Sequence, residues 1–102
     1  MPTTDYKTAL LIRLADAKYA AGYLNAALAE GDDAFLLALR DVVDAQGGMT
    51  WLSRNTRLNR VTLYRLLSGK GNPTLASLST IMHALGLEIG CHAASGRKRH
   101  AA

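Results

Sequence analysis

Several features are missing from this 102-residue sequence, and each absence excludes a class of protein. Cys91 is the one cysteine, so no disulfide can form within the chain, and a reducing compartment fits this composition. No apolar run approaches the roughly 20 residues that cross a bilayer, and the N-terminus lacks the basic start of a signal peptide. We therefore expect a cytoplasmic protein without a membrane anchor.

Catalytic and metal-binding patterns are also missing. Cys91 and the three histidines show neither a C-x-x-C nor an H-x-x-x-H spacing, which argues against a metal site. The acidic residues form no paired-carboxylate site, no glycine-rich phosphate loop follows a strand, and no nucleophile can be matched with a base. We predict that the protein is not an enzyme and needs no metal or other cofactor.

Acidic residues are absent between Asp44 and Glu88, and this gap divides the chain by charge. Residues 1–44 contain four lysines and arginines against seven acidic residues, a formal charge of −3. Residues 45–102 contain eight against Glu88 alone, a formal charge of +7. An acidic front half and a basic back half indicate two surfaces with different partners.

Strand signals are sparse and apolar residues recur at helical spacing, which predicts an all-α fold, a compact domain of five or six helices. Residues 5–14 are predicted as a short helix, although the run ALLI leaves a strand open. A second helix is predicted over residues 17–29 with Asp16 as its N-cap, and a third begins at an N-cap that is Asp32 or Asp33. The predicted inward positions of the second and third helices are Ala20, Tyr23, Leu24, Ala27, Leu28, Phe35, Ala38, Leu39, Val42 and Val43.

The end of the chain predicts one more helix and then loses its periodicity. This helix follows its N-cap Thr74 and stops at Gly86. Residues 87–91 are predicted as a short extended segment, and residues 95–102, which are polar, as a disordered tail. The core positions predicted for this helix are Leu75, Leu78, Met82 and Leu85.

Residues 49–69, MTWLSRNTRLNRVTLYRLLSG, predict two short helices joined by a tight turn. The first covers residues 50–56, with Trp51 at the edge of the core. The second covers residues 60–68, with Asn59 as N-cap and Gly69 as C-cap. The predicted inward side consists of Leu52, Leu58, Leu63, Leu66 and Leu67.

The opposite side of the second helix is basic, which is typical of a helix-turn-helix that approaches a phosphate backbone. Arg60 and Arg65 are predicted to read base edges, since arginine can be bidentate to guanine, and Val61 can contact a thymine methyl group. The predicted backbone contacts are Thr50, Arg54, Arg57, Thr62, Tyr64, Ser68 and Lys70. Because one small domain buries little DNA, we expect a homodimer on double-stranded operator DNA, with half-sites about one helical turn apart.

The stretch over residues 49–87 resembles the helix-turn-helix of phage-type repressors and their bacterial relatives. The matching pieces are L-S in the first helix, L-N-R before the second, the Leu63/Leu66 pair, S-G-K-G-N-P-T and A-L-G-L. Upstream, YLNAALAEGDDAFLLALRDVVDAQGGM resembles the HigA-like antidote (antitoxin) proteins of addiction modules. This resemblance implies a lambda-repressor-like fold, repression of the protein's own operon, and binding of a small RelE-superfamily, HigB-like toxin. The acidic front half suits a basic toxin.

Two residues depart from these relatives. Arg57 stands where glycine is common, because the chain often takes a left-handed conformation there. An arginine in that conformation costs on the order of 1 kcal/mol relative to glycine, and we hypothesise that a phosphate contact compensates. Val61 stands where relatives often carry a polar residue, so the sequence specificity should be this protein's own.

The sequence leaves two other functions open: a stand-alone phage-type repressor without a toxin, and a helical protein-interaction module that does not bind DNA. The first predicts no toxin-like reading frame beside the gene, and the second predicts no salt-dependent DNA binding. In the preferred reading the chain has three parts: a helical extension over residues 1–31, a helix-turn-helix domain over residues 32–90 and a polar tail over residues 91–102.

Overall fold

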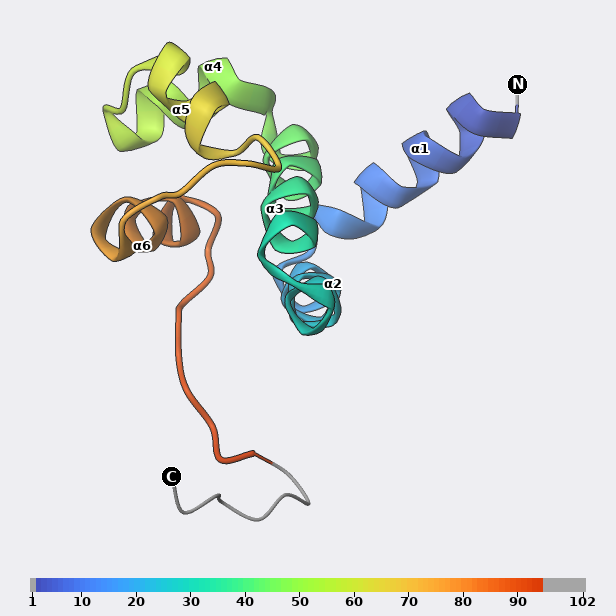
Figure 1. Cartoon of the computed structure of the whole chain (residues 1–102). Helices are drawn as coiled ribbons and strands as arrows, with labels where there is room; N and C mark the ends of the chain where they lie inside the picture. The colour runs from blue at the N-terminus through green and yellow to red at the C-terminus, as the bar shows by residue number, and fades with distance from the viewer. Residues whose placement is uncertain (1, 95–102) are drawn as a thin grey trace.

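Six α-helices build the computed structural model, which describes residues 2–94 (Figure 1). No strand occurs in this part of the chain, so the predicted all-α fold is confirmed. None of the helices within it is long and apolar enough to cross a membrane. The predicted disordered tail, residues 95–102, lies outside the described residues. The helices are α1 (Pro2–Leu14), α2 (Ala17–Glu30), α3 (Asp32–Gln46), α4 (Gly48–Thr56), α5 (Arg60–Leu66) and α6 (Leu75–Ala84).

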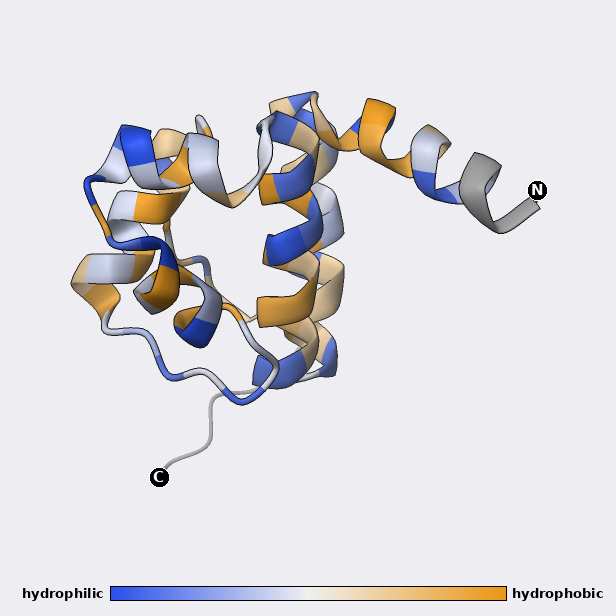
Figure 2. Cartoon of the chain, turned by 90° about the horizontal axis from the view of Figure 1, so that it is seen from above, coloured by the Kyte–Doolittle hydropathy of each residue, from blue (hydrophilic) through white to orange (hydrophobic). Residues whose placement is uncertain are grey.

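Helix α1 resolves the choice left open for residues 5–14, which form a helix and not a strand. Its C-terminal end joins the rest of the molecule through Leu14, which is fully buried. The helix then extends away from the other five as an arm (Figures 1 and 2). Tyr6 and Ile12 on this arm are exposed.

The N-caps of α2 and α3 differ from each other in kind. The Asp16 carboxylate accepts a hydrogen bond from the Tyr19 N–H at 3.0 Å, so the predicted cap of α2 is confirmed. The predicted cap of α3 is wrong, because Gly31 occupies that position with φ 138°, a conformation that an aspartate would adopt only with strain. Asp32 and Asp33 instead lie in the first turn, where their charges face the positive end of the helix dipole.

The core draws residues from all six helices, and α3 supplies the most. The prediction of a core position is wrong for two residues, since Leu28 is 52% and Leu75 71% exposed. Leu28 lies in the last turn of α2, and Leu75 is the first residue of α6, so each stands at a helix end beyond the packed interface. The buried residues are Leu14, Ala20, Leu24, Leu36, Ala38, Leu39, Val42, Val43, Met49, Leu52, Leu63, Leu67, Ile81, Met82, Leu85 and Leu87.

Helices α4 and α5 have bounds that differ from the predicted ones. Helix α4 begins at Gly48, because Gly47, at φ 141°, turns the chain sharply beside Trp51. Trp51 is half-buried against the core, as predicted. Helix α5 ends at Leu66, two residues before the predicted end, because the chain folds back over it: a Cβ on Gly71 would lie 2.0 Å from the Leu66 carbonyl oxygen.

The last helix and the segment after it follow the sequence more closely. The Thr74 hydroxyl accepts a hydrogen bond from the Ser77 N–H at 3.0 Å, so the predicted N-cap of α6 is confirmed. Gly86 follows the helix with φ 79°. Residues 87–91 form neither helix nor strand, although Leu87 is buried and its N–H reaches the Met82 carbonyl at 2.8 Å. The three-part division of the chain stays a prediction.

Candidate nucleic-acid interface

The turn between α4 and α5 contains a left-handed residue. Arg57 has φ 64° and ψ 16°, and within residues 2–94 it is the one non-glycine residue with a positive φ. The expected left-handed conformation is therefore confirmed. An L-residue pays about 1–2 kcal/mol for it, so the surroundings must hold the turn in place.

Two hydroxyl groups hold this turn by satisfying both backbone groups of Leu58. The Ser53 hydroxyl donates to the Leu58 carbonyl at 2.6 Å. The Thr56 hydroxyl accepts from the Leu58 N–H at 3.1 Å and donates to the Leu52 carbonyl at 2.7 Å. Because Leu58 also packs against the core, its position is determined from the inside and along the backbone. The turn sets α5 at a defined angle to α4.

Asn59 then starts α5, as predicted. Its side-chain oxygen accepts hydrogen bonds from the N–H groups of Val61 at 2.7 Å and Thr62 at 3.3 Å. A capping asparagine of this kind is worth about 1 kcal/mol. The cap matters for function because α5 has only seven residues, too few to be stable without its ends and its packing.

Helix α5 has one side that faces the core and one side that faces solvent. Leu63 is fully buried and Leu66 half-buried, while Val61 is 72% exposed. Of the predicted base-reading residues, Arg60 and Arg65 are exposed as well. The structure thus brings the three onto one helix with their side chains available to a partner, and their contacts with bases remain a proposal.

The residues predicted to contact the DNA backbone surround the outer side of α5, and they differ in how exposed their side chains are. Thr62 and Ser68 are half-buried, and the Ser68 hydroxyl donates to the Arg65 carbonyl at 3.0 Å. That bond occupies the Ser68 proton, although the oxygen keeps acceptor capacity. The exposed members of the set are Thr50 and Arg54 on α4, Arg57 in the turn, Tyr64 on α5 and Lys70 after it.

Arg40 belongs to this surface and was missed by the sequence analysis. Its guanidinium carbon lies 5.2 Å from the centre of the Tyr64 ring, a cation–π contact between α3 and α5. It adds a fifth arginine near helices α4 and α5, and it connects the outer side of α5 to α3. One sequence signal was available: Arg40 is the only basic residue of α3.

The charges of this surface form no ion pair with any other described residue. Helices α4 and α5 contain no acidic residue. The only ion pair among the described residues joins Lys7 to Asp41 at 3.4 Å, in the acidic half. Arg54, Arg57, Arg60 and Arg65 therefore keep their full charge toward solvent, which favours an anionic partner.

Asp41 lies at the junction of α1, α2 and α3 and accepts two hydrogen bonds there. The Tyr23 hydroxyl donates to it at 2.7 Å, and Lys7 approaches its other oxygen. Burial, together with the hydrogen bond to Asp41 and the charge of that carboxylate, raises the pKa of Tyr23 from 10.0 to about 12. This network ties the arm to the body and does not extend to α5.

Comparison with known proteins agrees with the antidote resemblance. A protein of Haemophilus influenzae strain Rd, described as uncharacterized, is 40% identical over 68 residues, which are 66% of this chain and 69% of the relative. No solved structure gives a significant match. A family model described as "Probable addiction module antidote protein" matches residues 6–93, nearly the whole described part. The chain belongs to this family of addiction-module antidote proteins.

Proposed function

We propose that this antidote protein binds double-stranded operator DNA as a homodimer, represses its own operon in the cytoplasm, and neutralises a small RelE/HigB-like toxin. The observation that supports DNA binding is the outer side of α5, where exposed arginines without acidic neighbours flank a capped helix. Family membership supports the antidote role. The relationship to HigA-like antitoxins and to phage-type repressors is part of the same proposal.

In this mechanism α5 enters the major groove and α4 lies across the DNA backbone. Arg60 and Arg65 would each donate two hydrogen bonds to a guanine, worth about 1–3 kcal/mol of discrimination per base pair. Val61, which has nothing to donate, would select the methyl group of thymine. Phosphate contacts from the surrounding set would supply most of the affinity and all of its salt dependence.

Arg40, on α3, supports the DNA contacts of α5 in this mechanism through Tyr64. Its contact with Tyr64 limits the rotamers of the tyrosine and holds a positive charge beside it. The phenol can then meet a phosphate oxygen while the guanidinium adds to the local potential. Arg40→Met would keep much of the side-chain length and lose the cation, so weaker DNA binding without loss of stability is the expected result.

The experiment that tests this function is a titration of the purified protein against DNA from its own promoter and against scrambled DNA, at two salt concentrations. Specific binding that weakens with salt is expected. Arg60→Ala and Arg65→Ala should remove most of the preference for the promoter, about tenfold or more for each lost bidentate contact. Arg13→Ala, an exposed arginine of the α1 arm, is the matched control and should bind like the wild type.

Equal affinity for the two DNAs at both salt concentrations would refute the reading function. The helix-turn-helix would then be a scaffold for protein contacts. The toxin half of the proposal has its own test, co-expression with the small protein encoded beside the gene. Growth that is not rescued, together with no complex on co-purification, would refute that half alone.

A further inference from the structure

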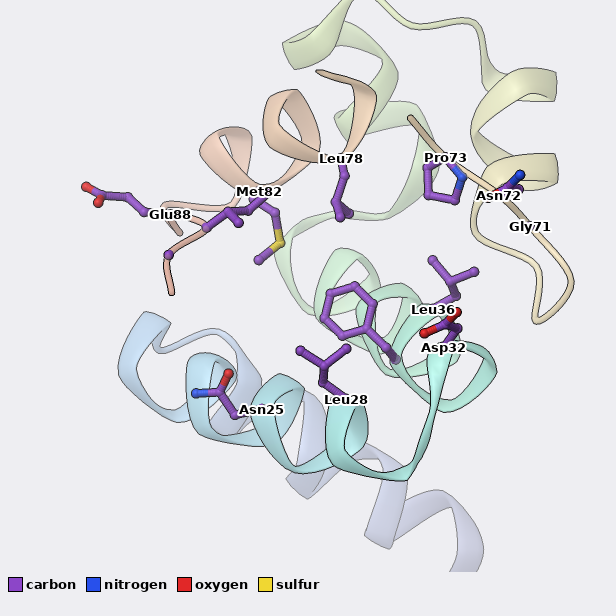
Figure 3. Close-up of a pocket in the computed structure, with 13 residues that line it drawn as sticks. Asn25, Leu28, Asp32, Leu36, Gly71, Asn72, Pro73, Leu78, Met82 and Glu88 are labelled. Atoms are coloured by element: carbon purple, nitrogen blue, oxygen red, sulfur yellow. The ribbon is translucent and has the colours of Figure 1, made fainter. Parts of the chain in front are cut away.

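An apolar groove opens between the α2–α3 pair and α6, and its rim includes residues 71–73, which follow α5 in the chain (Figure 3). Its volume is about 320 Å³, room for a few side chains of a partner. In Figure 3 the side chains of Leu28 and Leu36 face those of Leu78 and Met82 across this space. Phe35, Pro73 and Ile89 complete the apolar lining.

The mouth of the groove exposes aliphatic side chains that the fold does not cover. Leu28 is 52% and Ile89 42% exposed, and both line the same cavity although they are far apart in the chain. Single exposed aliphatic residues are ordinary on a protein surface, but two that border one concave apolar site indicate a site for contact. This clustering accounts for Leu28, whose exposure contradicted its helical pattern.

The charged residues that line the groove have one sign. Asp32 and Glu88 line it, both exposed, and no lysine, arginine or histidine does. Neither carboxylate takes part in an ion pair within residues 2–94. An occupant that fits would therefore present aliphatic or aromatic side chains next to a lysine or arginine.

The negative charge of the groove distinguishes between two candidate occupants, a second copy of this chain and a basic partner protein. A second copy docked groove to groove would bring the carboxylates of both copies together, and like charges at an interface are unfavourable. A basic partner protein meets no such repulsion. The groove shares no lining residue with the proposed DNA-contacting set, although Gly71 in its lining directly follows Lys70 of that set.

We infer that this groove is the docking site for the toxin of the module, which inserts an apolar segment flanked by basic side chains. The inference rests on the proposed antidote function and assigns its second surface. DNA is bound by the basic half of the chain, and the toxin is bound where the acidic half meets α6.

The test uses the full-length chain and, as the probe, the purified protein encoded beside its gene, with binding measured by calorimetry. Leu28→Arg should weaken binding about tenfold or more, because it places a charge in the apolar contact. Leu75→Arg is the matched control, since Leu75 is an exposed leucine of α6 whose side chain does not line the groove, and this variant should bind like the wild type. Asp32→Asn combined with Glu88→Gln should weaken binding several-fold and reduce its salt dependence.

A second variant, in a segment outside the helices, serves as the control for loss of folding. Ile89→Arg changes a residue in a coil segment, so it should weaken toxin binding like Leu28→Arg while the helical circular dichroism stays unchanged. Promoter binding by both variants should match the wild type. That result separates the two surfaces.

Three outcomes would overturn the inference. If Leu28→Arg and Ile89→Arg bind the neighbouring protein as tightly as the wild type, the groove is not the site and the antidote function still stands. If the same variants lower the oligomeric mass and leave toxin binding intact, the occupant is a second copy. If the wild type does not bind the neighbouring protein, the toxin half of the proposed function fails first and the inference falls with it.

Discussion

Replacing Arg57 by glycine should stabilise the protein and weaken its binding to DNA. The residue has φ 64° and ψ 16°, where an L-residue pays about 1–2 kcal/mol. Glycine removes that strain but makes the unfolded chain more flexible, which costs roughly 0.5–1 kcal/mol. Taken near the middle of both ranges, the net gain is roughly 0.5–1 kcal/mol, since the Arg57 N–H bond to the Ser53 carbonyl, 2.8 Å long, is kept.

The assay has two readouts because the two effects have different causes. Thermal unfolding followed by circular dichroism should show a Tm higher by about 2–8 °C, given roughly 4–8 °C per kcal/mol for a domain of this size. Titration of promoter DNA over a range of salt should show a shallower dependence, by about one phosphate contact. Arg57→Ala loses the same charge and keeps the strained backbone, so it should share the binding defect without the gain in Tm.

Each readout can refute its own part of the reasoning. A Tm that is unchanged or lower in Arg57→Gly would mean that the turn is not strained, and that Ser53 and Thr56 hold it at no cost. An unchanged salt dependence in both variants would mean that the guanidinium does not reach a phosphate. Arginine at this position would then have no account in the structure.

Three further changes test contacts that hold the fold together, two of them at the ends of α5 and one at the junction of α1, α2 and α3. Asn59→Ala should lower the free energy of unfolding by about 1 kcal/mol, measured with urea, because α5 loses its cap. Tyr23→Phe should remove a phenol transition centred near pH 12 from the ultraviolet titration; since the pKa is raised in the fold, the stability that Tyr23 contributes with Asp41 is complete below pH 10 and is lost as pH rises through about 12. Gly71→Ala should destabilise by about 1–3 kcal/mol in a thermal melt, because its Cβ would lie 2.0 Å from the Leu66 carbonyl oxygen.

Each of these has a control on the same chain. Asn59→Asp keeps an acceptor at the cap and should retain the stability, and an equal loss with Ala and Asp would contradict the capping role. Tyr19→Phe should leave the transition near pH 12 in place. Gly22→Ala, in the middle of α2 with nothing within 4 Å of the added Cβ, should stabilise by roughly 0.5–1 kcal/mol. A stabilised Gly71→Ala would show that the fold-back after α5 relaxes freely.

Much of the local structure was predictable from the chain. The caps Asp16, Asn59 and Thr74 are as predicted, because a capping side chain bonds an N–H two or three residues away and needs nothing else. The left-handed conformation of Arg57 was expected from the resemblance, in which glycine is common at that position, and not from the local sequence. The N-cap of α3 was not predictable, because an aspartate pair and a preceding glycine are both acceptable caps and the positive φ of Gly31, which only glycine adopts without strain, decided between them.

The candidate site was predictable in part, for a related reason. The periodicity of α5 placed Leu63 inward and Val61 outward, since a seven-residue helix on a core has one apolar side. The same rule failed for Leu28 and Leu75, because periodicity gives the direction of a side chain and not whether a neighbour covers it.

Contacts between helices depended on tertiary structure alone. The pairing of Arg40 with Tyr64, the hydrogen bond of Tyr23 to Asp41 and the apolar groove all join residues on different helices. Composition and local spacing specified the helices, their caps and the division of charge, because those follow from hydrogen bonds and side-chain positions within a few residues. How the helices cross, and therefore which polar groups meet and which apolar surface stays open, follows from the packing of the whole core at once.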